Sequence, residues 1–277
     1  MNLPRRAPRL LAAACALFAS GCGKQTFLAV AMLQTPPVPN PVQPSQPIAA
    51  QTLLTAYLGT IDTTNPTKID SSAIAPVTGA KGSVAFHSAA KNTDNNLAIG
   101  EQAQGTYELD SLKEPKLSAE TDQQYTVVFQ GGEGDTAYGA KLLPPPPTQI
   151  KEFHPNQILT WTAPQAFTVT RADGPGKDGR LLPIFVTVGQ VDPQNPSATP
   201  AITHTTAPTD GTALLKFALS DLPYRVASVE VPARAFPGKG FYVVTLLVVR
   251  YGLVSDNTFL GSTALTASGD AGLIAIQ

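Results

Sequence analysis

The chain opens with a short apolar segment rather than with an alternating pattern. Leu10–Ala19 is apolar throughout, three arginines precede it, and the small residues Ser20 and Gly21 follow it. A cationic start, an apolar stretch and small residues, in that order, are typical of a secretory signal peptide. The apolar stretch is too short to cross a bilayer as a helix, which takes roughly 20 residues. We therefore expect residues 1–21 to be removed on export.

Alternation of apolar and polar positions begins further along and predicts β-strands. Leu54, Ala56 and Leu58 are separated by polar or smaller residues, which is the period of a strand with one buried face. Further short strands are expected at Ser83–His87, Thr106–Leu109 and Tyr125–Gln130, with turns at Asp94–Asn96 and Gly131–Asp135. Together they predict a small antiparallel β domain over residues 51–143. Phe27–Leu33 is apolar at every position, which suits either a first strand or a segment lying against a bilayer.

Prolines divide the chain into three parts. Six prolines fall between Thr35 and Pro47, where neither a helix nor a sheet ladder is expected. We interpret residues 22–50 as an N-terminal segment with an extended, Pro-rich stalk. The four consecutive residues Pro144–Pro147 predict a stiff, solvated linker between two domains.

The second half, residues 148–277, also has strand-like patterns. The expected strands are Ile158–Ala163, Phe167–Thr170, Leu181–Val188, Val226–Val231 and Phe241–Val249. The last of these is apolar on both faces for much of its length, as in a central strand covered by a second layer. Asp192–Asp210 is rich in Pro, Thr and Asn and predicts a long loop.

The composition supports an all-β protein. The chain has 26 Pro and 22 Gly, and 14% of its residues are charged, which favours many turns and short strands. Loss of Arg5, Arg6 and Arg9 with the signal peptide would leave 16 Lys+Arg against 20 Asp+Glu. Nucleic-acid binding is not expected from this balance, because phosphates require clustered positive charge.

A cysteine follows the apolar segment directly. Ala19-Ser20-Gly21-Cys22 resembles the lipobox of bacterial lipoproteins, although Ala19 stands where that family usually has Leu. The resemblance implies cleavage between Gly21 and Cys22, acylation of the Cys22 sulfur and a membrane anchor. With Gly23 next, it also implies sorting to the outer membrane, on its periplasmic or its surface face. The alternative is ordinary signal cleavage that leaves Cys22 as a free thiol.

A second resemblance concerns residues 148–277. Trp161 on an early strand is followed by Pro164, and Pro237-Gly238 leads into Phe241-Tyr242 and a valine-rich strand. This order is similar to fibronectin type III and related immunoglobulin-like sandwiches. The resemblance implies that Phe241 or Tyr242 takes the corner position of such a sandwich. We expect Trp161 to belong to the core rather than to a sugar-binding platform.

Residues suited to catalysis are scattered. His87, His154 and His204 lack metal-ligand spacing, and no nucleophile elbow, P-loop or dinucleotide fingerprint occurs. The loop Arg171–Arg180 holds Asp173 and Asp178, too few carboxylates for a calcium site, and predicts a hairpin. We expect no catalytic residue, no metal and no cofactor.

The sequence therefore predicts an all-β, lipid-anchored envelope protein with two antiparallel β domains, the second an immunoglobulin or fibronectin-like sandwich. The leading hypothesis is a non-enzymatic binding or structural module that meets an envelope protein or a glycan. The alternative is an accessory subunit of an outer-membrane secretion, motility or adhesion assembly that docks by a strand edge. A hydrolase would need two facing carboxylates in a pocket.

Overall fold

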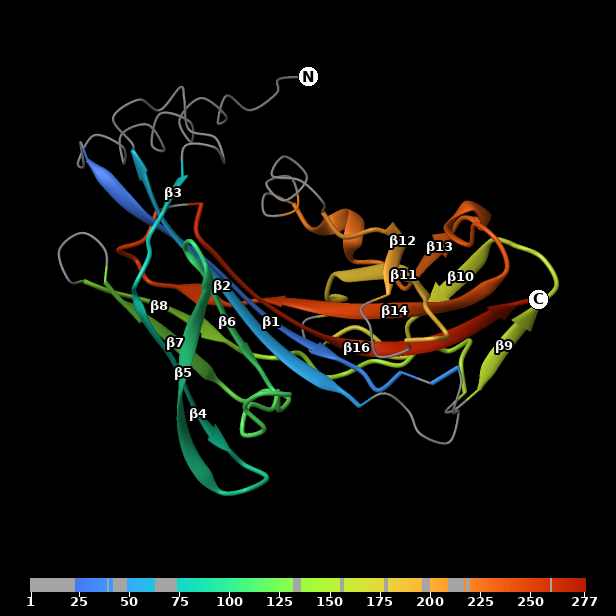
Figure 1. Ribbon diagram of the computed structural model, residues 1–277, viewed down its shortest axis with the longest axis horizontal. Helices are drawn as coiled ribbons and strands as arrows, with labels where there is room; N and C mark the ends of the chain where they lie inside the picture. Colours follow the sequence, from blue (N-terminus) through green and yellow to red (C-terminus); the bar gives the residue numbers. More distant parts are fainter. Residues whose placement is uncertain are drawn as a thin grey trace, which may run out of the picture.

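The computed structural model is built almost entirely of β-strands, which confirms the predicted fold class (Figure 1). It describes residues 23–38, 40–41, 49–62, 74–131, 136–154, 157–176, 179–195, 200–208, 217, 220–259 and 261–277. The helical elements that carry labels are two short 3-10 turns, η5 (Leu222–Tyr224) and η6 (Ala233–Ala235). No helix in these described ranges is long and apolar enough to cross a membrane.

One sheet of 14 strands runs through the molecule. Its strands are, in spatial order, β12 (Ala201–Thr205), β11 (Ile184–Val191), β14 (Gly240–Tyr251), β16 (Thr263–Ile276), β1 (Lys24–Thr35), β2 (Gln51–Asp62), β6 (Thr106–Asp110), β5 (Thr93–Ala103), β4 (Lys81–Ser88), β7 (Tyr125–Gln130), β8 (Ala137–Leu142) and β15 (Leu253–Val254). Outside this order, β3 (Ile74–Pro76) pairs with β2, and β9 (Ile158–Trp161) pairs with β16. Most pairs are antiparallel, but β16 pairs in parallel with both β1 and β9.

We call the strands β1–β8, with β15 and the first half of β16, the first region. Here the sheet curls until it meets itself, since β15, which follows β14 after Gly252, pairs with β8 while β14 pairs with β16. The inward side chains form one apolar core. Its largest fully buried members are Tyr107, Tyr125, Phe129, Leu28, Met32, Leu54, Leu58 and Leu117.

The prolines after Thr35 do not form the N-terminal stalk that the sequence predicts, because a complete strand comes before them. Phe27–Leu33 lies inside β1, so a full core strand precedes the prolines. β1 and β2 pair along their whole length, and Thr35 stands opposite Gln51. Pro36 is buried. The proline segment thus joins two paired strands, and because its two ends are side by side it cannot act as a spacer that lifts the fold.

The remaining strands and the second half of β16 form the second region, which is a sandwich. β10 (Phe167–Thr170) and β13 (Ser228–Val231) make a separate two-stranded sheet. This small sheet covers a core formed by β9, β11, β14 and β16. The arrangement is compatible with the predicted immunoglobulin-like sandwich. β14, expected as a central strand, lies between β11 and β16.

Tyr242 takes the corner position that the sequence left open. Its side chain is fully buried, and its hydroxyl accepts from the Gly238 amide at 3.1 Å and donates to the Gly238 carbonyl at 2.9 Å. Phe241 lies on the opposite face of β14 against a separate small cluster. Trp161 packs against Phe167 and Phe236, so its predicted core role is confirmed.

Pro144–Pro147 is held against β16 rather than fully solvated. Pro144 and Pro145 are buried. Thr266 Oγ1 donates to the Leu143 carbonyl at 2.9 Å, and Ser268 Oγ donates to the Pro145 carbonyl at 2.7 Å. Because prolines have no N–H for a sheet ladder, side-chain hydroxyls of β16 satisfy carbonyls here instead.

Several local predictions were wrong. Asp94–Asn96 lies within β5 rather than in a turn, and β12 occupies part of the loop predicted at Asp192–Asp210. Arg171–Arg180 is not a hairpin, because β10 before it and β11 after it belong to different sheets. The long C-terminal strand β16 was not predicted at all.

Candidate functional site

The predicted processing site lies at the edge of the described chain. Gly21 and Cys22 are outside the described residues, which begin at Gly23. β1 begins at Lys24, one residue later. The candidate anchor therefore adjoins the end of the first region at which β1 starts. We call that end the proximal end, defined by Lys24, Ala75, Pro76 and Phe259.

Strand pairing gathers the proximal end from distant parts of the chain. Lys24 stands opposite Asp62 at the end of β2, and Thr60 stands opposite Ala75 of β3. The Phe259 amide donates to the Thr26 carbonyl at 2.7 Å, which holds the loop before β16 against β1. Ala75 and Pro76 are exposed. These contacts hold β2, β3 and the loop before β16 together beside the start of β1.

Hydrogen bonds of Tyr107 hold the backbone next to the proximal end in place. The buried Tyr107 hydroxyl accepts from the Ala80 amide at 3.0 Å and donates to the Val77 carbonyl at 2.9 Å. Burial raises the pKa of Tyr107, so the phenol stays neutral and keeps both bonds. Gly105 has a φ of +69°, and a Cβ there would meet the Leu58 carbonyl oxygen at 2.7 Å. The turn into β6 therefore requires glycine.

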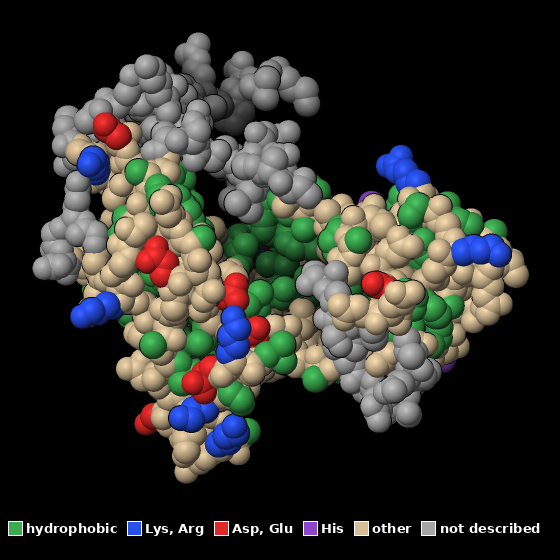
Figure 2. Space-filling view, in the orientation of Figure 1, with side chains coloured by type: hydrophobic (Ala, Val, Ile, Leu, Met, Phe, Trp, Pro, Cys, Tyr) green, Lys and Arg blue, Asp and Glu red, His purple; other side chains and the backbone are tan. Residues whose placement is uncertain are grey.

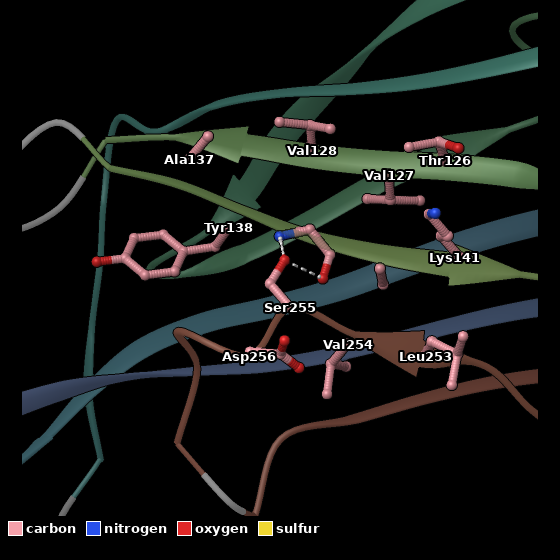
Figure 3. A pocket seen from close by; sticks show the side chains of 12 residues that line it. Thr126, Val127, Val128, Ala137, Tyr138, Lys141, Leu253, Val254, Ser255 and Asp256 are labelled. Atoms are coloured by element: carbon pink, nitrogen blue, oxygen red, sulfur yellow. Dashed lines mark hydrogen bonds between the residues drawn. The ribbon is translucent and has the colours of Figure 1, made fainter.

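An open cleft of about 360 Å³ lies along β7, β8 and β15 (Figure 3). Ser255 is the best candidate for a nucleophile among the residues that line the cleft. Its Oγ accepts from the Gly139 amide at 2.8 Å and donates to the Gly139 carbonyl at 3.0 Å. The hydroxyl proton is therefore engaged by backbone, and no imidazole is among the cleft-lining residues to remove it. This Ser255 bonds β15 to β8, which is a structural role.

The charged residues of the cleft do not form a catalytic pair. Lys141 and Asp256 both line it, and Asp256 is the one carboxylate in that lining. Two facing carboxylates, the arrangement expected of a glycoside hydrolase, are not present among these lining residues.

The three histidines lie apart from one another. His87 Nδ1 lies 2.8 Å from Asp94 Oδ1 on the exposed β4–β5 hairpin, and His154 is exposed. His204 lies on β12, and its Nε2 is buried without a hydrogen-bond partner. Burial, and then the charge of Arg234, lower the pKa of His204. No group of three or more metal-ligating side chains gathers in the described part of the chain.

The loop considered for calcium is occupied by an ion pair. Asp173 pairs with Arg171, whose side chain is 1% exposed, and also accepts from Thr148 Oγ1. Burial by itself raises the pKa of Asp173, but the hydrogen bonds from Arg171 and Thr148 and the charge of Arg171 together lower it below its usual value. Asp178 lies outside the described residues. With its carboxylate bound to Arg171, Asp173 serves the fold rather than a metal.

β12 is the end strand of the large sheet and was missed by the sequence analysis. It pairs with β11 on one side, with a register shift at Val188/Gly189. On its other side no strand pairs with it in the described ranges. Ile202 on this strand is 60% exposed. The only sequence signal was the short alternation Ile202, His204 within a Pro- and Thr-rich segment.

Hydrophobic side chains also line a hollow between the two regions (Figure 2). Apolar atoms form a large share of every protein surface, so this hollow alone assigns no partner.

Comparisons with known proteins add little. No protein-family model matches the chain, and no curated protein matches it. Among solved structures, it is similar to the three N-terminal domains of the bacteriophage RB49 Highly Immunogenic Outer Capsid protein (Hoc). The sequence identity is 10%, the match covers 91% of this chain and 71% of that chain, and the TM-score is 0.22. A similarity this distant carries no functional argument.

Proposed function

We propose that this chain is a lipid-anchored protein of the bacterial outer membrane whose β fold acts as a non-enzymatic binding or structural module. The observation that carries the proposal is the sequence Ala19-Ser20-Gly21-Cys22 at the end of an apolar segment, with the first strand beginning two residues later at Lys24. Acylation at Cys22 adds about 0.8 kcal/mol of membrane affinity per buried methylene, so two or three chains hold a protein on a bilayer.

Replacement of Cys22 tests the anchor. The unchanged chain should fractionate with membranes, and mass spectrometry of its N-terminal peptide should show a diacylglyceryl group on Cys22. Cys22→Ser should move the protein to the soluble envelope extract, while Ser20→Ala, which keeps a small residue, should leave it in the membrane. A wild-type N-terminal peptide without acyl mass, together with membrane fractionation of Cys22→Ser, would show the proposal to be wrong.

The edge of β12 that no described strand pairs with favours a second candidate function, an accessory subunit of an outer-membrane secretion, motility or adhesion assembly. An unpaired strand edge can accept a strand of another protein through main-chain hydrogen bonds. Ile202 would supply exposed apolar area beside that edge.

Crosslinking in intact cells, followed by mass spectrometry, tests this docking. A partner bound at β12 should crosslink near Ile202, and Ile202→Asp should reduce its recovery several-fold. Leu112→Asp is the matched control, because Leu112 is 67% exposed in the first region, far from β12 in the sheet order. Equal recovery with both variants would exclude docking at β12. Absence of any reproducible protein partner would leave a glycan as the ligand to test.

A further inference from the structure

The position of β1 relative to Cys22 constrains how an anchored chain meets the membrane. Only Gly23 separates Cys22 from Lys24, the first residue of β1. Two extended residue steps span at most about 7 Å. The acylated residue and the start of the folded body therefore cannot be farther apart than the thickness of a lipid headgroup layer.

The prolines do not supply a spacer between Cys22 and the fold. The prolines after Thr35 follow β1, and Thr35 Oγ1 both accepts from the Gln51 amide and donates to the Gln51 carbonyl, each at 3.2 Å. These bonds join β1 and β2 at the end of the hairpin where the connecting segment leaves β1 and enters β2. Whatever path the prolines take, they cannot increase the distance between Cys22 and Lys24.

We propose that the proximal end lies directly on the lipid bilayer surface, with the strands of the first region leading away from it. This inference rests on the proposed acylation of Cys22. The exposed surface that meets the headgroups includes Ala75 and Pro76 of β3. These are small, uncharged residues on a short strand that is hydrogen-bonded to β2. They can approach a headgroup layer without burying an unpaired charge.

The far end of the first region then lies well above the membrane. Leu112 belongs to that end, because the Ser111 amide donates to the Thr52 carbonyl at 2.9 Å and Thr52 stands opposite Gln34 near the end of β1. β1 has 12 residues. At about 3.3 Å per residue, its far end lies up to about 36 Å from Lys24.

Photo-crosslinking to lipid tests the orientation. Ala75 or Leu112 is replaced by p-benzoylphenylalanine, and the chain purified from membranes is placed in vesicles of phosphatidylethanolamine and phosphatidylglycerol. Both positions are exposed, so both variants should fold. Lipid adducts at position 75 should exceed those at position 112 several-fold. Equal adducts at the two positions, or more at position 112, would overturn the proposal.

A spacer provides the matched control. Ten Gly and Ser residues inserted between Gly23 and Lys24 add a flexible segment with an end-to-end distance of about 17 Å. The insertion should reduce the adducts at position 75 several-fold without changing the membrane-bound fraction. Unchanged adducts would mean that another surface, rather than the short tether, sets the orientation.

A second preparation separates this proposal from the proposed function. The chain starting at Cys22 is coupled through its thiol to a maleimide phospholipid in the same vesicles. Neither this chain nor the crosslinking variants contain another cysteine. If the cellular protein has no acyl mass, the proposed function fails, yet the coupled chain still gives a clear answer. A preference for position 75 in that preparation supports the geometry, and no preference overturns it.

Discussion

The two regions of this protein enclose their cores in different ways. In the first region one sheet curls until β15 pairs with β8, and the strands surround Tyr107, Tyr125 and Phe129. In the second region the sheet stays open and needs a cover, which β10, β13 and a chain of aromatic rings provide. The comparison shows that one sheet can be self-enclosed at one end and a sandwich layer at the other.

β16 can belong to both regions because the residues on one of its faces differ in character along the strand. Ala264 faces the first core, and Ile274 and Ile276 face the second. Between them, Ser268 Oγ and Asp270 Oδ2 bond the crossing segment at the Pro145 carbonyl and the Ile150 amide, the latter at 2.8 Å. The middle of β16, where the two regions join, is thus polar and hydrogen-bonded, while the two ends of the strand are apolar.

The largest effect is expected from Val244→Asp. Val244 is fully buried in the second core on β14, and an unpaired carboxylate there costs several kcal/mol. Because β14 pairs with β16 along 12 positions, we expect the first region to lose its structure as well. Circular dichroism and denaturant titration measure this. Lys239→Asp, at an exposed position just before β14, should unfold like wild type. A soluble product in which the first region still melts cooperatively would show that the regions fold independently.

Gly269→Ala should be the next most severe change. A Cβ at Gly269 would lie 1.7 Å from the Leu246 carbonyl oxygen, and backbone atoms cannot yield as a flexible side chain does. We expect a loss of about 3 kcal/mol in the free energy of unfolding, measured by urea titration. Gly174→Ala is the control, since nothing lies within 4 Å of its added Cβ. Similar midpoints for the two variants would contradict a tight approach at the joint.

One buried tyrosine in each region provides a matched pair. Tyr125 donates to the Ser118 carbonyl and accepts from the Glu120 amide at 2.9 Å, while Tyr242 bonds both polar groups of Gly238. Phenylalanine at either position leaves those backbone groups unpaired at a cost of about 1–2 kcal/mol. We expect similar losses from Tyr125→Phe and Tyr242→Phe in denaturant titrations. A loss confined to one of them would mean that the two regions depend unequally on such anchors.

Stability should fall in alkali through the first region. Burial raises the pKa of Tyr125 to about 12, whereas a tyrosine in the unfolded chain ionises near 10. The folded state then binds more protons than the unfolded state between these values. The stability that Tyr125 contributes is present below pH 10 and is lost as the pH rises towards 12, and this one group adds no more than about 1.4 kcal/mol per pH unit to the slope. Denaturant titrations across this range measure the slope, which Tyr125→Phe should reduce. An unchanged slope in that variant would contradict the assignment.

Arg250→Ala should have the smallest effect. Arg250 on β14 reaches Asp122 at 2.8 Å, but the Asp122 side chain is 67% exposed. Exposed ion pairs contribute about 0–1 kcal/mol. Thermal melting should therefore change little, and high salt should remove most of the difference between this variant and wild type. A loss as large as that of the tyrosine variants would assign Arg250 a larger part in joining the regions.

Part of this architecture could be predicted because it depends on local pattern. Alternation at Leu54–Leu58 and the β-branched run at Tyr125–Gln130 each match a strand with one buried face. β5 could not be predicted in this way. Its Asp94–Asn96 segment is mostly exposed and lies in a long hairpin with β4, so backbone pairing holds these polar residues in a strand despite their low β-propensity.

The candidate site also has a part that local sequence predicts and a part that only the tertiary structure reveals. The sequence by itself determined the all-β class and led to the proposed export signal with Cys22 after it, because these depend on neighbouring residues and on composition. Only the tertiary structure decided that β1 starts two residues after Cys22, at Lys24, and pairs with a strand near the other end of the chain, with Ala29 opposite Thr263. No local pattern encodes such a parallel pairing, since its register depends on which apolar faces enclose a shared core. Lys24 itself is held in the fold by pairing with Asp62 of β2, so an anchor at Cys22 would have no stalk.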